Sequence, residues 1–140
     1  MTQVSEIMTR GVRTLAPGET VMKAAQAMKE LDVGVIPVCD GQKLVGMVTD
    51  RDIVLRGVAN GCVVDQARLA DVMTSDTHWC FEDQTLEEVS QTMRDSQIRR
   101  LPVVDHDRHL VGILSLGDIA TRTRTEAETG VTLEEISKRR

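Results

Sequence analysis

The stretch "GMVTDRDI", residues 46–53, has the form of a strand that ends at Thr49 and a helix that begins there. Nearly the same pattern returns as "GILSLGDI", residues 112–119. Both copies keep a hydroxyl and, three residues later, a carboxylate: Thr49 with Asp52, and Ser115 with Asp118. Such a pair starts a helix without any ligand, because the hydroxyl and the acid each accept a hydrogen bond from a free backbone N–H group. The pairs therefore predict helix caps, ligand-binding groups, or both.

The similarity between the two copies extends along the chain. Met8-Thr9 recurs as Met73-Thr74, and Pro37 recurs as Pro102, each 65 residues further on. After the first predicted hairpin turn the offset is 66, as from Gly46 to Gly112, so the second copy's turn holds one additional residue. A fixed internal period of this length predicts a duplicated supersecondary unit.

Each repeat predicts the element order β-α-β-β-α. Thr20 precedes apolar residues at helical spacing, namely Val21, Ala24, Ala25, Met28 and Leu31. In the second repeat Thr85 and Glu88 form a capping box ahead of Leu86, Val89 and Met93. Residues 33–49 and 98–115 each predict a β-hairpin, and short helices follow over residues 50–57 and 116–124.

The predicted fold class is α+β: two β-α-β-β-α repeats related by a pseudo-twofold axis, packed through their sheets, with two clefts between them. The predicted boundaries are 1–62 and 63–124 for the repeats and 125–140 for a C-terminal tail. Because proline cannot donate a ladder hydrogen bond, the strands holding Pro37 and Pro102 should lie at a sheet edge or break their pairing there. The tail has a capping box, Thr132 with Glu135, so it forms either a short docking helix or a frayed end.

Composition excludes several classes of function. A formal net charge of -5, one Trp, one Phe and no Tyr argue against nucleic-acid binding. No apolar run is long enough to cross a bilayer and no secretory signal is visible, so we expect a cytoplasmic protein. The sequence holds none of the common catalytic motifs, which argues against an enzyme. The three cysteines predict reduced, mostly buried thiols, with a disulfide between two of them left open.

The chain resembles a tandem pair of cystathionine β-synthase-type (CBS) domains, a Bateman module, from about Val4 to Thr123. The residues that carry the resemblance are "IMT" and "VMT", "VIPV" and "LPVV", and above all "GMVTDRDI" and "GILSLGDI". The resemblance implies a stand-alone regulatory module that senses AMP, ADP or ATP, or less often NAD or S-adenosylmethionine. It also implies a homodimer that signals to an effector protein, with no cofactor required and no metal.

The resemblance also assigns roles to individual residues. Asp52 and Asp118 would hold ribose hydroxyls, and Thr49 and Ser115 would hold ribose or phosphate oxygens. The chain beside each proline would read the adenine edge, in the segments Val35, Ile36 and Pro37, and Arg100, Leu101 and Pro102. Thr14 and Trp79 would line the base pockets.

Four charged or titratable residues are further candidates for phosphate. Arg99 or Arg100 would face a phosphate, since guanidinium matches phosphate geometry. Arg51 would reach one too, although its neighbour Asp50 repels anions, and His78 would contact phosphate or base. The repeats differ here, because Leu116-Gly117 replaces Asp50-Arg51, so the two sites need not bind the same ligand.

Two alternatives stay open at this stage. The H-x-x-H pattern of His106 and His109 suggests a metal, but its place in a hairpin turn favours a solvated loop. The chain could instead be a structural dimerisation or interaction protein whose clefts are vestigial, since Leu116 and Gly117 replace polar positions of the first repeat.

Overall fold

The computed structural model describes residues 1–122, and the predicted tail helix lies outside this range. The chain divides into two compact units, which are described separately. We name them by their place in the sequence: the central unit is Arg13–Thr77, and the terminal unit combines Met1–Val12 with the chain from His78 onward. The boundaries predicted from the sequence repeat, 1–62 and 63–124, remain a prediction. Within residues 1–122 no helix is long and apolar enough to span a membrane.

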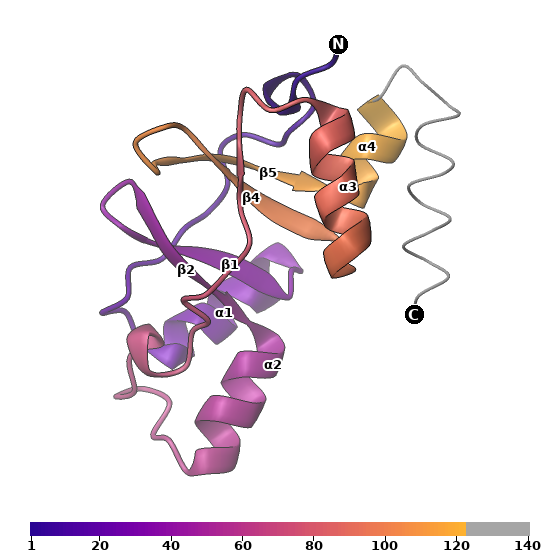
Figure 1. The fold of residues 1–140 in the computed structure, drawn as a ribbon. Coiled ribbons are helices and arrows are strands. Elements are labelled where there is room, and N and C mark those ends of the chain that lie inside the picture. The colour runs from indigo at the N-terminus through magenta and orange to yellow at the C-terminus, as the bar shows by residue number, and fades with distance from the viewer. Residues whose placement is uncertain (123–140) are drawn as a thin grey trace. The chain divides into compact units, whose positions relative to one another are not determined.

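The central unit holds an antiparallel hairpin, two α-helices and short 3₁₀ and π turns, whose order can be followed in Figure 1. Its elements are α1 (Val21–Leu31), β1 (Val35–Asp40), β2 (Lys43–Thr49), α2 (Asp50–Asp52), η2 (Ile53–Gly57), η3 (Val58–Asn60) and η4 (Leu69–Asp71). α2, η2 and η3 follow one another as one short helical stretch whose middle turn is a π-helix. Leu15 adds a parallel bridge to Val38 on the other side of β1.

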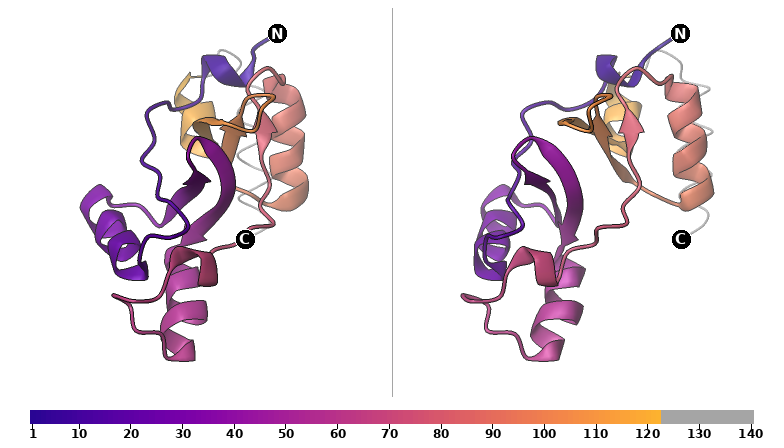
Figure 2. Two further views of the ribbon diagram at one scale, coloured as in Figure 1. Left: turned by 90° about the vertical axis from the view of Figure 1, so that its left-hand side faces the viewer. Right: turned by 60° about the vertical axis from the view of Figure 1, so that its left-hand side comes forward.

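The terminal unit repeats this arrangement with a three-stranded sheet, which Figure 2 shows in two further views. Its elements are η1 (Val4–Glu6), β3 (Cys80–Phe81), α3 (Leu86–Ser96), β4 (Arg100–Val104), β5 (Leu110–Ser115) and α4 (Leu116–Arg122). The β-α-β-β-α order predicted for each repeat is therefore confirmed, as is the α+β fold class.

The proline-containing strands do not both lie at a sheet edge. β4 is the middle strand, because it pairs with β3 on one side and β5 on the other, so the edge prediction is wrong for Pro102. The sheet tolerates the proline because β3 pairs only with Val103 and Val104, beyond the position that lacks an N–H group. The alternative prediction, that pairing breaks at the proline, describes this side of β4.

The predicted helix starts are confirmed by their hydrogen bonds. Thr20 Oγ accepts from Lys23 N at 3.2 Å, and Thr85 Oγ accepts from Glu88 N at 3.2 Å. Thr85 N donates in return to Glu88 Oε1, which completes the capping box. This arrangement lowers the pKa of Glu88, chiefly through the hydrogen bond from the Thr85 backbone.

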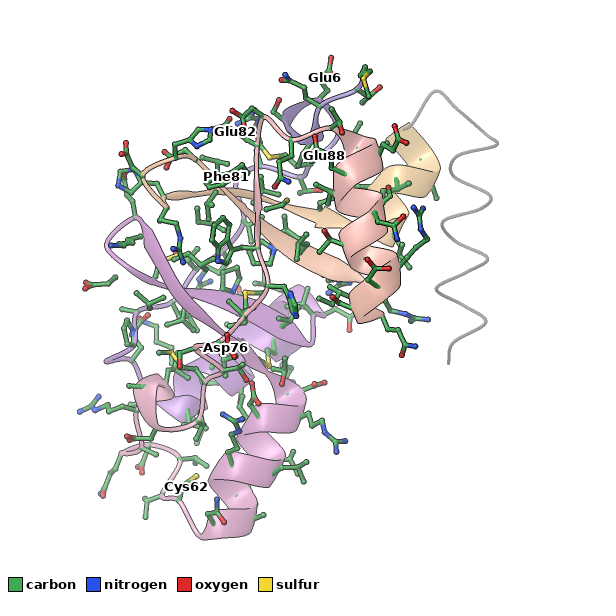
Figure 3. The ribbon with its side chains drawn as sticks, in the orientation of Figure 1. Glu6, Cys62, Asp76, Phe81, Glu82 and Glu88 are labelled. Atoms are coloured by element: carbon green, nitrogen blue, oxygen red, sulfur yellow. The ribbon has the colours of Figure 1, made fainter. Side chains whose placement is uncertain are left out.

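The opening segment of each repeat lies in the unit that contains the helix and hairpin of the other repeat. Val4 N, in η1, donates to Gln84 O, and Leu86 N donates to Thr2 O, so η1 lies at the start of α3. Figure 3 labels Glu6 of η1 and Glu88 of α3, which locate these two elements. In the central unit the equivalent bonds run from Val21 N to Ala67 O and from Leu69 N to Glu19 O. The two openings are thus exchanged.

A Met-Thr segment follows each opening and crosses a strand at close range. Thr9 and Ile113 exchange two backbone hydrogen bonds of 2.8 and 3.0 Å, and Thr74 and Met47 exchange two of 2.8 and 2.9 Å. A Cβ atom on Gly112 would lie 2.8 Å from Thr9 O, and one on Gly46 would lie 2.7 Å from Thr74 O. Because real Cβ atoms do not approach a backbone oxygen this closely, both strands need glycine at the crossing.

The apolar core is divided between the units. In the terminal unit, α3 contributes Leu86, Val89 and Met93 to a cluster that includes Leu101 and Leu114. In the central unit, Val21, Ala24, Ala27 and Met28 of α1 pack with Ile36, Val38 and Val48. The predicted stripe on α1 is correct except at two places: Ala27 is buried where Ala25 was expected, and Leu31 is 43% exposed.

All three cysteines are free thiols, as the sequence predicted. Cys39 and Cys80 are buried, while Cys62 is half-buried. Burial raises the pKa of Cys39 and raises that of Cys80 to about 12, since an apolar environment disfavours the thiolate.

The β4–β5 turn folds over β3 through ring contacts. His106 stacks on Phe81, the ring labelled in Figure 3, with centroids 4.4 Å apart, and Arg108 lies 4.3 Å from the Trp79 ring centroid. The His106 ring also lies 2.7 Å from Asp83 Oδ2, which raises the histidine's pKa through the hydrogen bond and the opposite charge. The predicted loop is thus exposed at His106, while its contacts with the rings of Phe81 and Trp79 hold it in place.

We predict that Gly112→Ala destabilises the protein by about 1–3 kcal/mol, because the added methyl group meets the backbone of the Met-Thr segment. Urea denaturation followed by circular dichroism measures the change. Gly18→Ala is the matched control, since a Cβ there meets nothing within 4 Å. Equal stabilities of the two variants would contradict the proposed need for close approach.

Candidate functional site

The central unit places its hydroxyl and carboxylate where β2 ends and α2 begins. Thr49 Oγ accepts from Asp52 N at 2.9 Å, and Asp52 Oδ2 accepts from Thr49 N at 3.1 Å. Thr74 Oγ lies 3.4 Å from both carboxylate oxygens of Asp52. Arg56 Nε lies 3.8 Å from Asp52 Oδ1, and its Nη1 donates to Met73 O at 3.1 Å. The carboxylate therefore joins the helix cap to the Met-Thr segment.

The terminal unit builds the same junction between β5 and α4. Ser115 Oγ accepts from Asp118 N, and Asp118 Oδ2 accepts from Ser115 N, both at 3.1 Å. Thr9 Oγ donates to Asp118 Oδ1 at 2.9 Å, a shorter bond than its counterpart in the central unit. Asp118 is 9% exposed and is one of two buried polar residues among those described.

Capping leaves acceptor capacity on both carboxylates. An ionised carboxylate offers about four lone-pair positions. Asp118 uses one on Ser115 N and one on Thr9 Oγ. By this count two acceptor positions of Asp118 remain, which is the number of hydroxyl donors in a ribose cis-diol. The same side chain can therefore cap a helix and bind a ribose, so the two interpretations are compatible in chemistry.

The strand register places the residues expected to contact adenine beside these strand–helix junctions. Val35 pairs with Thr49 in the central unit, and Arg100 pairs with Ser115 in the terminal unit. Ile36 and Leu101 are 1% and 0% exposed, so each residue as a whole, backbone included, is covered by the rest of the protein. Pro37 and Pro102 are buried as well.

Thr14 and Trp79 occupy equivalent places one residue before a strand-like segment. Thr14 precedes Leu15, which bridges Val38, and Trp79 precedes Cys80, which pairs with Val103. Both are half-buried. Arg108 covers part of one Trp79 face and Phe81 meets the ring at an interplanar angle of 75°. The adjacent His78 is exposed.

The candidate phosphate contacts are distributed unevenly between the units. Arg99 and Arg100 are exposed, and within residues 1–122 neither has a carboxylate oxygen within 4.0 Å. Arg51 is also exposed, but its backbone N donates to Asp50 Oδ1 at 2.8 Å. The central junction sets Arg51 and Arg56 against Asp50 and Asp52, whereas the terminal junction sets Arg99 and Arg100 against Asp118 alone, so the terminal junction is the more cationic of the two.

One group in the described chain has ligand atoms close enough for a metal ion: Asp105, Asp107 and His109, within 4.8 Å of one another. The β4–β5 turn accounts for this closeness, because Asp105 Oδ1 accepts from the backbone N of Asp107 and of His109 at 2.9 Å. Burial raises the pKa of Asp105, but these two backbone hydrogen bonds and the nearby His109 outweigh it, so the pKa is lowered overall.

Sequence reasoning missed three residues of the junctions: Thr9, Thr74 and Arg56. The recurrence of Met-Thr at a fixed offset is the available signal, but it indicates the repeat and the family resemblance rather than a contact with the capping aspartates. Nothing in the sequence states that a threonine reaches an aspartate 109 residues later.

We predict that Thr9→Val destabilises the protein by about 1–3 kcal/mol, because it removes the donor to a buried carboxylate oxygen. Thr9→Ser, which keeps the hydroxyl, should stay near wild type. Thr74→Val should cost less, since its hydroxyl lies 3.4 Å from Asp52. Denaturant titration compares the three variants, and a Thr9→Val protein as stable as Thr9→Ser would refute the assigned hydrogen bond.

Similar proteins share this arrangement of two repeats. The model of the CBS domain family matches residues 4–58 and 69–123. The CBS domain-containing protein YhcV of Bacillus subtilis is 42% identical over 137 residues, which cover 98% of this chain and 96% of YhcV. Hypoxic response protein 1 of Mycobacterium tuberculosis is 38% identical over 121 residues, or 86% of this chain and 84% of that protein.

Three solved structures have a similar fold. Hypoxic Response Protein I with two coordinated zinc ions superposes with a TM-score of 0.79 at 36% identity, covering 88% of this chain and 100% of that one. CBSX2 in complex with AMP gives 0.74 at 25% identity over 96% and 99%. The CBS domain pair of MJ0100 in complex with 5′-methylthioadenosine and S-adenosyl-L-methionine gives 0.72 at 28% identity over 86% and 94%. Because the family model matches both repeats and YhcV aligns along nearly its whole length, this chain belongs to the CBS domain family, as a tandem pair of CBS domains.

Proposed function

We propose that the chain is a regulatory module that binds adenosine-containing ligands, most often AMP, ADP or ATP, at its strand–helix junctions. The observation that carries the proposal is the pair of capping carboxylates, Asp52 and Asp118, each with unused acceptor positions beside a proline-containing strand. The ligand complexes of CBSX2 and MJ0100 support the ligand class.

Within this proposal the two carboxylates hold the ribose hydroxyls, while Thr49 and Ser115 contact ribose or phosphate oxygens. Backbone groups of Val35 and Ile36, and of Arg100 and Leu101, read the adenine edge. The ligand acts on the Met-Thr segment through Thr74 or Thr9, because these hydroxyls bind the same carboxylates whose remaining acceptor positions hold the ribose. A separate effector protein reads the effect on this segment, and the module itself performs no catalysis.

Calorimetry with AMP, ADP, ATP, NAD and S-adenosylmethionine tests the proposal. Wild type should bind at least one of them, and the double variant Asp52→Ala with Asp118→Ala should lose both the binding heat and any thermal stabilisation by ligand. Circular dichroism checks that the variant is folded. If folded, ligand-free wild type binds none of them at millimolar concentration, the sensor proposal fails and a structural dimerisation role replaces it.

We also propose that the module works in the cytoplasm as a homodimer. The three free thiols fit a reducing compartment. Half-exposed apolar side chains follow one another on the short helix of the central unit: Val54 at 54%, Leu55 at 47% and Val58 at 56%. Burying such side chains against a second copy removes apolar area from water, which favours association.

We predict that wild type sediments as a dimer and that Val54→Asp shifts it toward monomer, because a buried unpaired charge opposes association. Ala120→Asp is the matched control, since Ala120 is the exposed counterpart of Val54 in the second repeat. Analytical ultracentrifugation measures both. A monomeric wild type, or a Val54→Asp protein that stays dimeric, would contradict the assignment of this face.

A further inference from the structure

The two units make the same backbone hydrogen bond at the start of the helix that follows the hairpin, but with side chains of different charge. Asp50 N donates to Gly34 O at 2.9 Å in the central unit, and Leu116 N donates to Arg99 O at 3.0 Å in the terminal unit. The structurally equivalent pair is therefore glycine with an acid in one unit and arginine with leucine in the other. Both pairs lie directly beside the carboxylates of the proposed ligand sites.

In the central unit the side chain of Asp50 lies close to Gly34. Asp50 Oδ2 lies 3.0 Å from the place that a Cβ atom on Gly34 would take, and Asp50 Oδ1 accepts from Arg51 N at 2.8 Å. The carboxylate thus lies over Gly34 and uses the backbone donor of Arg51, the second residue of α2. An anionic group arriving here would meet a negative charge that already fills the space. The neighbouring Arg51 carries the opposite charge, but its contact with Asp50 is through its backbone N–H group, and the residue is exposed.

In the terminal unit the corresponding place carries two cations and no acid. Arg99 and Arg100 are exposed, and Arg100 lies opposite Ser115 in the sheet register. Leu116 and Gly117 bring no charge, and a Cβ on Gly117 would meet only Ser115 Oγ, at 3.5 Å. Guanidinium groups that have no carboxylate partner in the described chain are suited to bind phosphate oxygens in pairs.

We infer that the two junctions differ in ligand class: the terminal junction takes adenosine ligands that carry a 5′-phosphate, and the central junction takes adenosine ligands without one. The inference rests on the proposed function and deepens it. Ribose and adenine contacts are common to both junctions, so discrimination falls on the 5′ substituent. The residues that set it are Arg99 and Arg100 on one side and Asp50 on the other.

AMP and adenosine are the probes, because they differ only in the phosphate group. Asp52→Asn leaves the terminal junction as the working site, and Asp118→Asn leaves the central one. By calorimetry, Asp52→Asn protein should bind AMP about tenfold or more tightly than adenosine, as expected for charge-assisted hydrogen bonds. Added salt should reduce this preference. Asp118→Asn protein should bind adenosine at least as tightly as AMP.

Exchanging the equivalent pairs tests the named residues directly. In the Asp52→Asn background, Arg99→Gly with Leu116→Asp should remove the AMP preference of the terminal junction. In the Asp118→Asn background, Gly34→Arg with Asp50→Leu should create one in the central junction. Both members must change together, because a side chain at residue 34 meets Asp50. If the protein with Arg99→Gly and Leu116→Asp does not fold, Arg99→Gln, a change on an exposed side chain, gives the same comparison for the terminal junction.

The outcomes separate the inference from the proposed function. Equal AMP-to-adenosine ratios in the two single-junction variants, or a ratio that the exchanges do not move, overturn the inference and leave nucleotide sensing intact. An AMP preference found only at the central junction overturns it as well. If folded wild type binds neither AMP nor adenosine nor any other adenosyl ligand, both the proposed function and the inference fall.

Discussion

Each half of this protein depends on a backbone crossing that only glycine permits. The Met-Thr segment passes over a strand so closely that a methyl group on Gly46 or Gly112 would collide with a carbonyl oxygen. The crossing joins the opening of one repeat to the hairpin of the other through paired backbone hydrogen bonds. It also sets the threonine hydroxyl beside the aspartate that caps the next helix. The exchange of the opening segments, the start of the next helix and the candidate site therefore all meet at this crossing.

The capping aspartates serve a structural purpose whether or not a ligand binds. Each accepts one hydrogen bond from a backbone N–H group at the end of a strand and another from a threonine hydroxyl of the exchanged segment. A ligand that binds such a carboxylate contacts a group already tied to two parts of the chain. This arrangement gives a physical route from ligand binding to a change in the exchanged segment, without any long chain of intermediates.

Local chemistry could be read from the sequence, and long-range pairing could not. The capping boxes at Thr85 and Thr49, the hairpins and the element order followed from patterns that act within a few residues. The exchange of openings left no such pattern, because Val4 and Leu69 are equally apolar and either could pack in either core. The missing N–H group of Pro102 predicts either an edge strand or broken pairing, and the choice between them depends on β3, a distant segment that pairs only beyond the proline.

The exchange also sets an order of assembly during synthesis. The central unit is one continuous segment, Arg13–Thr77, so it can fold as soon as it leaves the ribosome. The terminal unit needs the first twelve residues together with the chain after His78. Its Thr9–Asp118 hydrogen bond joins residues 109 positions apart. The Thr9 hydroxyl therefore lacks this bonding partner until Asp118 has been synthesised. A nascent chain that stops short of Asp118 would hold one finished junction and an unpaired opening.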